Sequence, residues 1–199
     1  MINDDDYWNK FYEENLLLTE PSSFACYVED KYLKNSNTLL ELGCGNGRDA
    51  IFFAEKGKRV SALDLSSKVI NKLYSMKIRN AKFFNQDFSQ LSKFRNFDCI
   101  YSRFTMHSID EETEESVFEQ LPDALRKGGL FLMEARSSKD KTLDKAFGTA
   151  HFRRYLDYEE TVTKIEKLKF RVLHKIESQG LSPYKNEDPY LIRLVAEKC

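Results

Sequence analysis

Short strand-like segments and amphipathic helical segments alternate along most of this chain. Repeated strand–helix units of this kind predict an α/β fold in which a doubly wound, mostly parallel sheet has helices on both faces. The expected strands are 38–42, 59–63, 82–85, 97–101, 130–134, 170–177 and 190–196. The expected helices are 49–56, a segment capped by Ser66 with Val69, Ile70, Leu73 and Met76 on its apolar side, 111–126 and 157–168.

The C-terminal half contains three signals that bound these elements. Pro122 predicts a kink or a boundary in its helix. Gly128-Gly129 predicts a turn before the strand that follows. The linker between the last two strands is short and has no helical pattern, so we expect those strands to pair antiparallel.

Composition excludes several classes of protein. The 199 residues are enough for one domain, and Lys+Arg (31) nearly balance Asp+Glu (32), which argues against broad, non-specific binding of nucleic acid. The four cysteines show no C-x-x-C spacing, so we expect neither a disulfide framework nor a metal site. The N-terminus is acidic, and no apolar run approaches the roughly 20 residues that span a bilayer. The sequence therefore predicts a cytoplasmic, thiol-reduced protein that is not in a membrane.

A glycine cluster follows the first expected strand, in the segment Glu41-Leu42-Gly43-Cys44-Gly45-Asn46-Gly47-Arg48. Glycines at this place let the backbone turn tightly and approach a ligand. A dinucleotide fingerprint needs a small residue where Arg48 stands. A carboxylate at Glu41 also repels a pyrophosphate and favours a positively charged ligand, so the loop indicates S-adenosylmethionine rather than NAD. The alternative is a tight structural turn.

The next two strand ends carry polar residues that suit a nucleoside. Asp64 can accept hydrogen bonds from both hydroxyls of a ribose, and Asp87 and Phe88 can take the amino group and the face of an adenine. Each residue taken singly is equally typical of a helix cap or a turn. Their occurrence at successive strand ends favours the nucleoside.

These motifs, together with the segment 97–102, resemble the motif series of class I S-adenosylmethionine-dependent methyltransferases, over roughly residues 7–198. The resemblance implies a Rossmann-like, seven-stranded sheet whose last strand is antiparallel. It also implies that Gly43 and Gly45 lie against the methionine part of the cofactor, that Asp64 holds the ribose, and that the Ser102 region holds the ammonium group. The expected cofactor contacts are Trp8, Tyr12, Glu41, Gly43, Cys44, Gly45, Arg48, Asp64, Leu65, Asp87, Phe88 and Ser102.

The first 35 residues resemble the lid segment of small bacterial members, in front of a core at 36–199. In that interpretation Trp8 or Tyr12 closes over the cofactor. The alternative is an amphipathic helix packed on the sheet.

The segment after the fourth strand lacks the motifs of several methyltransferase classes. Ser102-Arg103-Phe104-Thr105 stands where amino methylation of nucleic acid uses [D/N]-P-P-[Y/F/W], and neither a Pro-Cys dipeptide nor a metal-binding acidic cluster is present. Basic residues follow instead, and clustered arginines suit a small anionic substrate. The expected substrate contacts are Arg103, Arg136, His151, Arg153 and Arg154. The alternative is that some of these arginines pair with acids at 110–115 or 157–160.

His107 is the candidate general base, because histidine titrates near neutral pH. If the acceptor is already an oxyanion, His107 is an anion ligand instead. His174 lies within an expected strand and is expected to be structural.

The sequence therefore predicts methyl transfer to an oxygen or nitrogen of a small anionic metabolite by a monomer or homodimer. A resemblance to small bacterial members of capsule and surface-polysaccharide pathways suggests a nucleotide-linked or phosphoryl-type precursor. The alternatives are a tRNA-modifying enzyme and a cofactor-binding subunit without catalysis.

Overall fold

The computed structural model describes residues 20–143 and 152–199. The predicted site residues Trp8, Tyr12 and His151 lie outside these ranges. The chain divides after Phe88 into two compact units, which are described separately.

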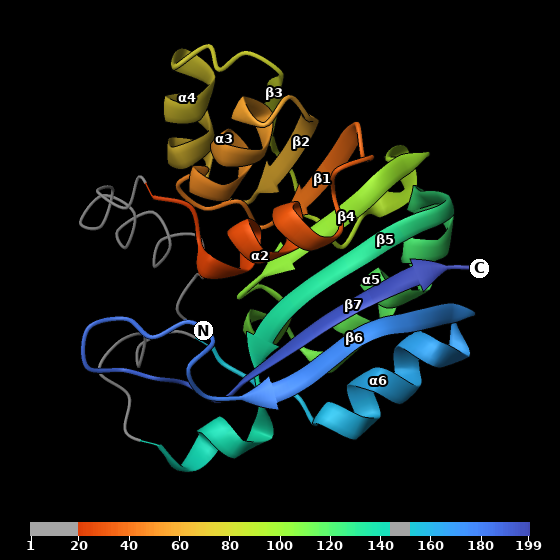
Figure 1. The fold of residues 1–199 in the computed structure, drawn as a ribbon. Helices are drawn as coiled ribbons and strands as arrows, with labels where there is room; N and C mark the ends of the chain where they lie inside the picture. The colour runs from red at the N-terminus through yellow and green to blue at the C-terminus, as the bar shows by residue number, and fades with distance from the viewer. Residues whose placement is uncertain (1–19, 144–151) are drawn as a thin grey trace. The chain divides into compact units, whose positions relative to one another are not determined.

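The first unit contains a parallel three-stranded sheet in the order β3-β2-β1, with helices between the strands (Figure 1). Its elements are α2 (Ser23–Lys31), β1 (Thr38–Leu42), α3 (Arg48–Glu55), β2 (Arg59–Asp64), α4 (Ser67–Ser75) and β3 (Ala81–Asn85). The predicted cap is confirmed, because Ser66 Oγ accepts the N–H of Val69 at 3.3 Å. Val69, Ile70 and Leu73 form the buried side of this helix, whereas Met76 is the residue after its last turn and is 49% exposed, so the predicted apolar side ends at Leu73.

The second unit contains a mixed sheet in the order β4-β5-β7-β6. Its elements are η1 (Leu91–Lys93), β4 (Phe97–Arg103), η2 (Met106–Ser108), α5 (Glu111–Ala124), β5 (Leu125–Arg136), η3 (Ser138–Thr142), α6 (Tyr158–Lys167), β6 (Phe170–Ser178) and β7 (Leu191–Lys198). Strands β4 and β5 are parallel, and β7 runs antiparallel to both β5 and β6. The predicted antiparallel last strand is confirmed.

Strand β5 is longer than predicted. It begins at Leu125, and the Gly128-Gly129 pair lies within the strand, where it forms a bulge. The register moves from Leu125 to Leu130 on β5 while β4 advances only from Phe97 to Cys99, and Gly128 adopts a φ of 70° that glycine tolerates. The predicted turn at this pair is therefore wrong. The preceding helix ends at Ala124, two residues after Pro122, so Pro122 lies near a boundary as predicted.

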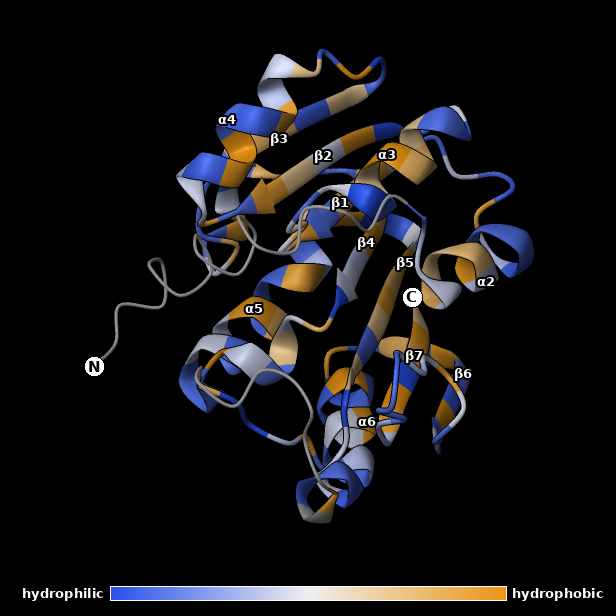
Figure 2. Ribbon diagram, turned by 90° about the vertical axis from the view of Figure 1, so that its left-hand side faces the viewer, coloured by the Kyte–Doolittle hydropathy of each residue, from blue (hydrophilic) through white to orange (hydrophobic). Residues whose placement is uncertain are grey.

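Helices α5 and α6 cover the same face of the second sheet. Phe118 of α5 packs edge-on against Phe131 of β5 with ring centroids 5.9 Å apart, and Tyr158 at the start of α6 lies under Lys175 of β6. The register places Phe131 and Lys175 on one face, because side chains alternate along each strand. Hydrophobic residues run along these strands (orange in Figure 2). Among the described residues, no helix is long and apolar enough to cross a membrane.

Candidate functional site

The glycine loop joins β1 to α3, and its three glycines have a left-handed backbone conformation. Gly43, Gly45 and Gly47 have φ values of 72°, 53° and 78°. A Cβ at Gly47 would lie 2.6 Å from Leu73 Cδ2. Both its conformation and its packing therefore require glycine at position 47.

Asp64 fastens this loop to the end of β2. One carboxylate oxygen accepts the N–H of Gly45 at 2.8 Å, and the other accepts the N–H of Ser66 at 2.9 Å. Asp64 is 8% exposed. Each oxygen of a carboxylate has two lone pairs, so a carboxylate can accept hydrogen bonds from the protein and from a ligand hydroxyl together.

The loop is a region of negative potential. Glu41 is buried at the end of β1, and Cys44 is buried in the loop. Burial raises the pKa of the Cys44 thiol well above its usual range, and the charges of Asp64 and Glu41 raise it further. A neutral thiol between two carboxylates disfavours a phosphate and favours a cation, which fits the sulfonium and ammonium groups of S-adenosylmethionine.

The predicted adenine residues follow the neighbouring strand β3. Asn85, which lies opposite Asp64 in the sheet, donates from its side chain to the carbonyls of Asp64 (3.2 Å) and Leu65 (2.7 Å). Asp87 is half-buried and Phe88 is buried, whereas Leu65 is 45% exposed. Asp64 and Leu65 thus lie at the end of β2, and Asp87 and Phe88 follow the end of the neighbouring strand β3.

The pair Ser22 and Asp49 beside the loop escaped the sequence analysis. Asp49, in the first turn of α3, accepts the backbone N–H and the hydroxyl of Ser22, both at 2.7 Å. Ser22 also caps α2, since its Oγ accepts the N–H of Ala25. The Pro-Ser-Ser run at 21–23 is typical of a helix start and signals the cap. No sequence pattern signals its partner, 27 residues away. The predicted cofactor residue Arg48 extends its Nε to within 3.9 Å of Asp49 Oδ1.

In the second unit, β4 extends to Arg103, two residues beyond the predicted strand 97–101, so Ser102 lies within the strand. Its side chain is fully buried, and its hydroxyl has no hydrogen-bond partner within the described part of the chain. Buried hydroxyls usually have a partner. A ligand ammonium or carboxylate would supply one, which fits the predicted contact.

Arg103, also in β4, belongs to a ladder of ion pairs across three strands. Arg103 Nε donates to Glu134 of β5 at 2.9 Å, and Arg193 Nε of β7 donates to the other oxygen of Glu134 at 2.6 Å. The three residues lie opposite one another in the sheet, and Glu134 is completely buried. The guanidinium of Arg103 also stacks over the Phe104 ring at 4.1 Å.

Arg136 and Arg154 hold carboxylates as well. Arg136, at the end of β5, pairs with Asp140 at 2.6 Å and with Glu187 at 2.9 Å. Arg154 pairs with the buried Glu114 at 2.6 Å, so the alternative that an arginine pairs with the 110–115 acids holds for this residue. Arg153 is half-buried in the same segment.

Burial governs the titration of Glu114. It raises the pKa of this carboxyl above its usual value, although the charges of Arg154 and Lys164 act in the opposite direction. Three of the five predicted substrate contacts, Arg103, Arg136 and Arg154, thus have carboxylate partners within the protein.

His107 lies in η2 and is 3% exposed. Its Nδ1 accepts the backbone N–H of Arg136 at 3.1 Å, and its carbonyl accepts the N–H of Arg154 at 2.7 Å. The ring packs edge-on against Phe104. Because Nδ1 acts as an acceptor, the neutral imidazole carries its proton on Nε2 and can donate from that atom.

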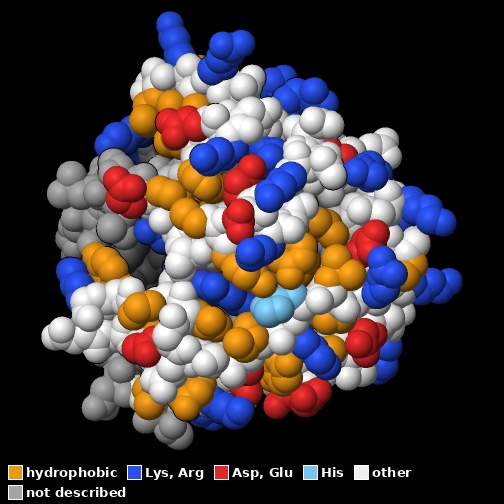
Figure 3. Space-filling view, in the orientation of Figure 1, with side chains coloured by type: hydrophobic (Ala, Val, Ile, Leu, Met, Phe, Trp, Pro, Cys, Tyr) orange, Lys and Arg blue, Asp and Glu red, His pale blue; other side chains and the backbone are white. Residues whose placement is uncertain are grey.

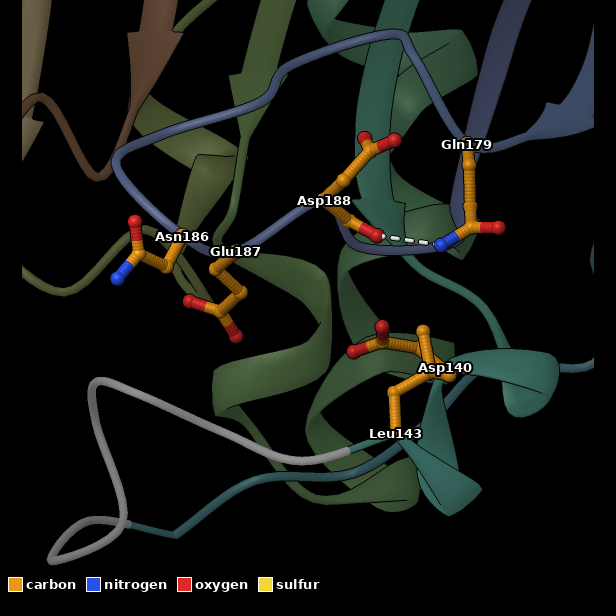
Figure 4. A pocket seen from close by; sticks show the side chains of 6 residues that line it. All are labelled: Asp140, Leu143, Gln179, Asn186, Glu187 and Asp188. Atoms are coloured by element: carbon orange, nitrogen blue, oxygen red, sulfur yellow. Dashed lines mark hydrogen bonds between the residues drawn. The ribbon is translucent and has the colours of Figure 1, made fainter.

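A pocket of about 270 Å³ opens near the ends of β5 and β6 (Figure 4). Its walls are Asp140, Leu143, Gln179, Asn186, Glu187 and Asp188. Three carboxylates and two amides make it polar and acidic. Nowhere in 20–143 and 152–199 are three or more His, Cys, Asp or Glu side chains grouped to hold a metal ion.

Part of the chain is similar to a known family. Residues 39–129 match the family model described as a methyltransferase domain. A Geobacillus sp. protein named as a methyltransferase is 26% identical over 111 residues, which are 53% of this chain and 44% of the relative. The chain thus spans less than half of the length of that relative.

Solved structures match over a larger part of the chain. The 1,6-didemethyltoxoflavin N1-methyltransferase of Burkholderia thailandensis, solved with its substrate and S-adenosylhomocysteine, has a TM-score of 0.75 and 18% identity, over 97% of this chain and 85% of that one. A glycopeptide N-methyltransferase solved with S-adenosylmethionine has a TM-score of 0.71 and 18% identity, over 92% and 96%. The predicted methyltransferase activity agrees with the family model over residues 39–129, and the solved structures confirm the predicted Rossmann-like, seven-stranded fold.

Proposed function

We propose that this methyltransferase domain transfers the methyl group of S-adenosylmethionine to a nitrogen or oxygen atom of a small molecule. The observation that carries the proposal is Asp64, whose carboxylate is fixed between the glycine loop and the start of α4 by two backbone N–H groups. Solved proteins of the same fold hold S-adenosylmethionine or S-adenosylhomocysteine.

The residues described above would hold each part of the cofactor. Asp64 would accept the ribose hydroxyls, and Leu65 and Phe88 would flank the adenine. Ser102 would supply its buried hydroxyl to the methionine end. When bound, S-adenosylmethionine supplies an electrophilic methyl group on a positively charged sulfur. The chain's part is to align the acceptor with that methyl group, and alignment supplies much of the rate.

The charges of the second unit favour an acceptor that is an amine. The ladder and the Arg136 cluster contain equal numbers of arginines and carboxylates: Arg103, Arg136 and Arg193 against Glu134, Asp140 and Glu187. Arginines neutralised in this way offer little net charge to an anion, and Asp188 adds to the pocket one carboxylate that is not part of this balance. Both solved neighbours described above are N-methyltransferases.

An anionic acceptor, as the sequence predicts, is the second candidate, and the half-buried Arg153 is the residue to replace in testing it. The capsule and surface-polysaccharide pathway also stays a prediction, so nucleotide sugars belong in the test. Among the described residues, basic (blue) and acidic (red) side chains are interspersed on the surface seen in Figure 3.

We propose that His107 is a hydrogen-bond donor to the acceptor and is not a general base, because its Nδ1 is already engaged by Arg136. A glutamine side chain can place an N–H donor near the position of the imidazole Nε2. An asparagine side chain is shorter, so it can only replace the acceptor at Nδ1 that binds the N–H of Arg136. His107→Gln should therefore keep more activity than His107→Asn. If His107 is an essential base, both variants should lose about 10²–10⁴-fold in kcat.

Two measurements test the proposed function. Calorimetry with S-adenosylhomocysteine tests the cofactor site, and the absence of binding would overturn the proposal. Mass spectrometry then searches for a gain of one methyl group in a panel of amines, amino-terminal peptides, nucleotide sugars, phosphorylated metabolites and tRNA. Binding without transfer to any member would favour the non-catalytic alternative.

A further inference from the structure

The β6–β7 loop, residues 179–190, is fastened to the sheet by arginines from three strands. Arg103 of β4 donates to the hydroxyl of Ser182 at 2.8 Å, and Arg193 of β7 donates to the carbonyl of Leu181 at 2.7 Å. Both arginines are held by the same buried carboxylate, Glu134. One glutamate therefore fixes two separate attachments of the loop.

Further contacts hold the other side of the loop, through Arg136 and Asp140. Arg136 of β5 binds Glu187 at 2.9 Å and Asp140 at 2.6 Å, and the remaining oxygen of Asp140 accepts the N–H of Tyr190 at 3.1 Å. Arg136 and Asp140 are both buried, at 5% and 0% exposed. Buried charged groups hold a loop firmly, because releasing either partner leaves an uncompensated charge.

The middle of the loop is a tight turn. Tyr184 and Glu187 each donate a backbone N–H to the carbonyl of the other, at 2.8 and 3.0 Å. Lys185 stands at the tip with a φ of 51°. The loop supplies four of the six residues that line the pocket: Gln179, Asn186, Glu187 and Asp188 (Figure 4).

We propose that Glu134 and Arg136 are positioning residues that hold the β6–β7 loop, through Glu187 among other attachments, as a preformed wall of the acceptor site, where Asn186 and Asp188 select the acceptor. The assignment to the acceptor rests on the proposed function. Arg103 and Arg136 lie at the carboxyl ends of the parallel strands β4 and β5, the edge at which sheets of this type bind their ligands. The arginines thereby act on the acceptor through the loop and do not bind its charge.

Trypsin tests the attachment directly, because Lys185 is the only lysine or arginine in residues 179–190. In the wild-type chain the tight turn should resist cleavage at Lys185. The Glu134→Gln variant and the loop variant Ser182→Ala/Glu187→Gln should each be cut there about tenfold faster or more, since cleavage follows the population of the released loop. Glu134→Asp, which keeps the charge, should restore part of the protection.

The matched control is Arg171→Ala. Arg171 forms a pair with Glu197 across the same two strands, but it is 69% exposed and far from the loop in register. Cleavage at Lys185 should be unchanged in this variant. The double loop variant keeps the ladder and the Arg136–Asp140 pair intact, so it tests the proposal even if Glu134→Gln does not fold.

Kinetics separate a positioning role from a merely structural one. With the panel amine that shows the highest turnover, the double loop variant should raise the acceptor KM about tenfold and leave kcat and the S-adenosylhomocysteine affinity unchanged. Unchanged cleavage in both loop-releasing variants, or unchanged acceptor KM in a variant that is cleaved faster, would overturn the proposal. Failure of the wild-type chain to bind S-adenosylhomocysteine would instead overturn the proposed function, and the cleavage result would still decide the attachment.

Discussion

Replacing Asp64 by asparagine should weaken both the fold and cofactor binding, by amounts that follow from its contacts. The carboxylate accepts two backbone N–H groups while nearly buried, and asparagine has only one acceptor oxygen. One charge-assisted hydrogen bond is lost, which costs about 1.5–3 kcal/mol of unfolding free energy. For a chain of this length that loss corresponds to a fall in Tm of about 3–12 °C.

The loss of affinity should be of similar size. If one ribose hydroxyl loses a charged acceptor, the Kd of S-adenosylhomocysteine should rise roughly 10- to 150-fold. Calorimetry measures the Kd, and urea denaturation measures the unfolding free energy. The matched control is Asp49→Asn, because Asp49 is also buried and its carboxylate also accepts two hydrogen bonds, from the backbone N–H and the hydroxyl of Ser22. This control should lose stability while the Kd stays the same. An unchanged Kd in Asp64→Asn would refute the assignment of Asp64 to the ribose.

Three further predictions concern stability. Gly47→Ala should lower the unfolding free energy by at least about 1–2 kcal/mol, because it forces a left-handed residue against Leu73, and a urea curve that matches the wild type would contradict this. Arg154→Ala should cost up to about 3–5 kcal/mol, since it leaves the buried Glu114 with less compensation, and a loss below 1 kcal/mol would show the pair to be dispensable. The third uses the raised pKa of Glu114. The folded state keeps the proton of Glu114 at a pH where the unfolded state has lost it. The unfolding free energy of the wild type, relative to that of Glu114→Gln, should therefore be greatest below the usual pKa of a glutamate and fall as the pH rises through the raised pKa. A difference in unfolding free energy that does not change with pH would contradict the burial argument.

The sequence predicted the elements that depend on local signals. The limits of β1, the cap at Ser66 and the helix after Asp157 were all visible in residue type and spacing, because capping and side-chain periodicity act within a few residues. The bulge at Gly128 was not visible, because a glycine pair is equally typical of a turn and only pairing with β4 shows which one forms.

The arginines show the limit for the candidate site. Their types and positions indicated a basic strand edge, and the structure does place Arg103 and Arg136 at the ends of their strands. Their partners lie between 4 and 79 residues away along the chain, in Glu134, Asp140, Ser182 and Glu187. Ion pairing over such separations is set by tertiary packing, so charge composition alone did not reveal that these arginines are neutralised.

The hydrogen bonds between Ser22 and Asp49 suggest where an N-terminal truncation can begin. Ser22 caps the start of α2 and is held there by Asp49, and all of these hydrogen bonds are made by residues after Glu20. A protein that starts at Glu20 would retain both hydrogen bonds and the helix cap. Comparing its cofactor affinity with that of the whole chain would isolate what the first nineteen residues, Trp8 and Tyr12 included, add to binding.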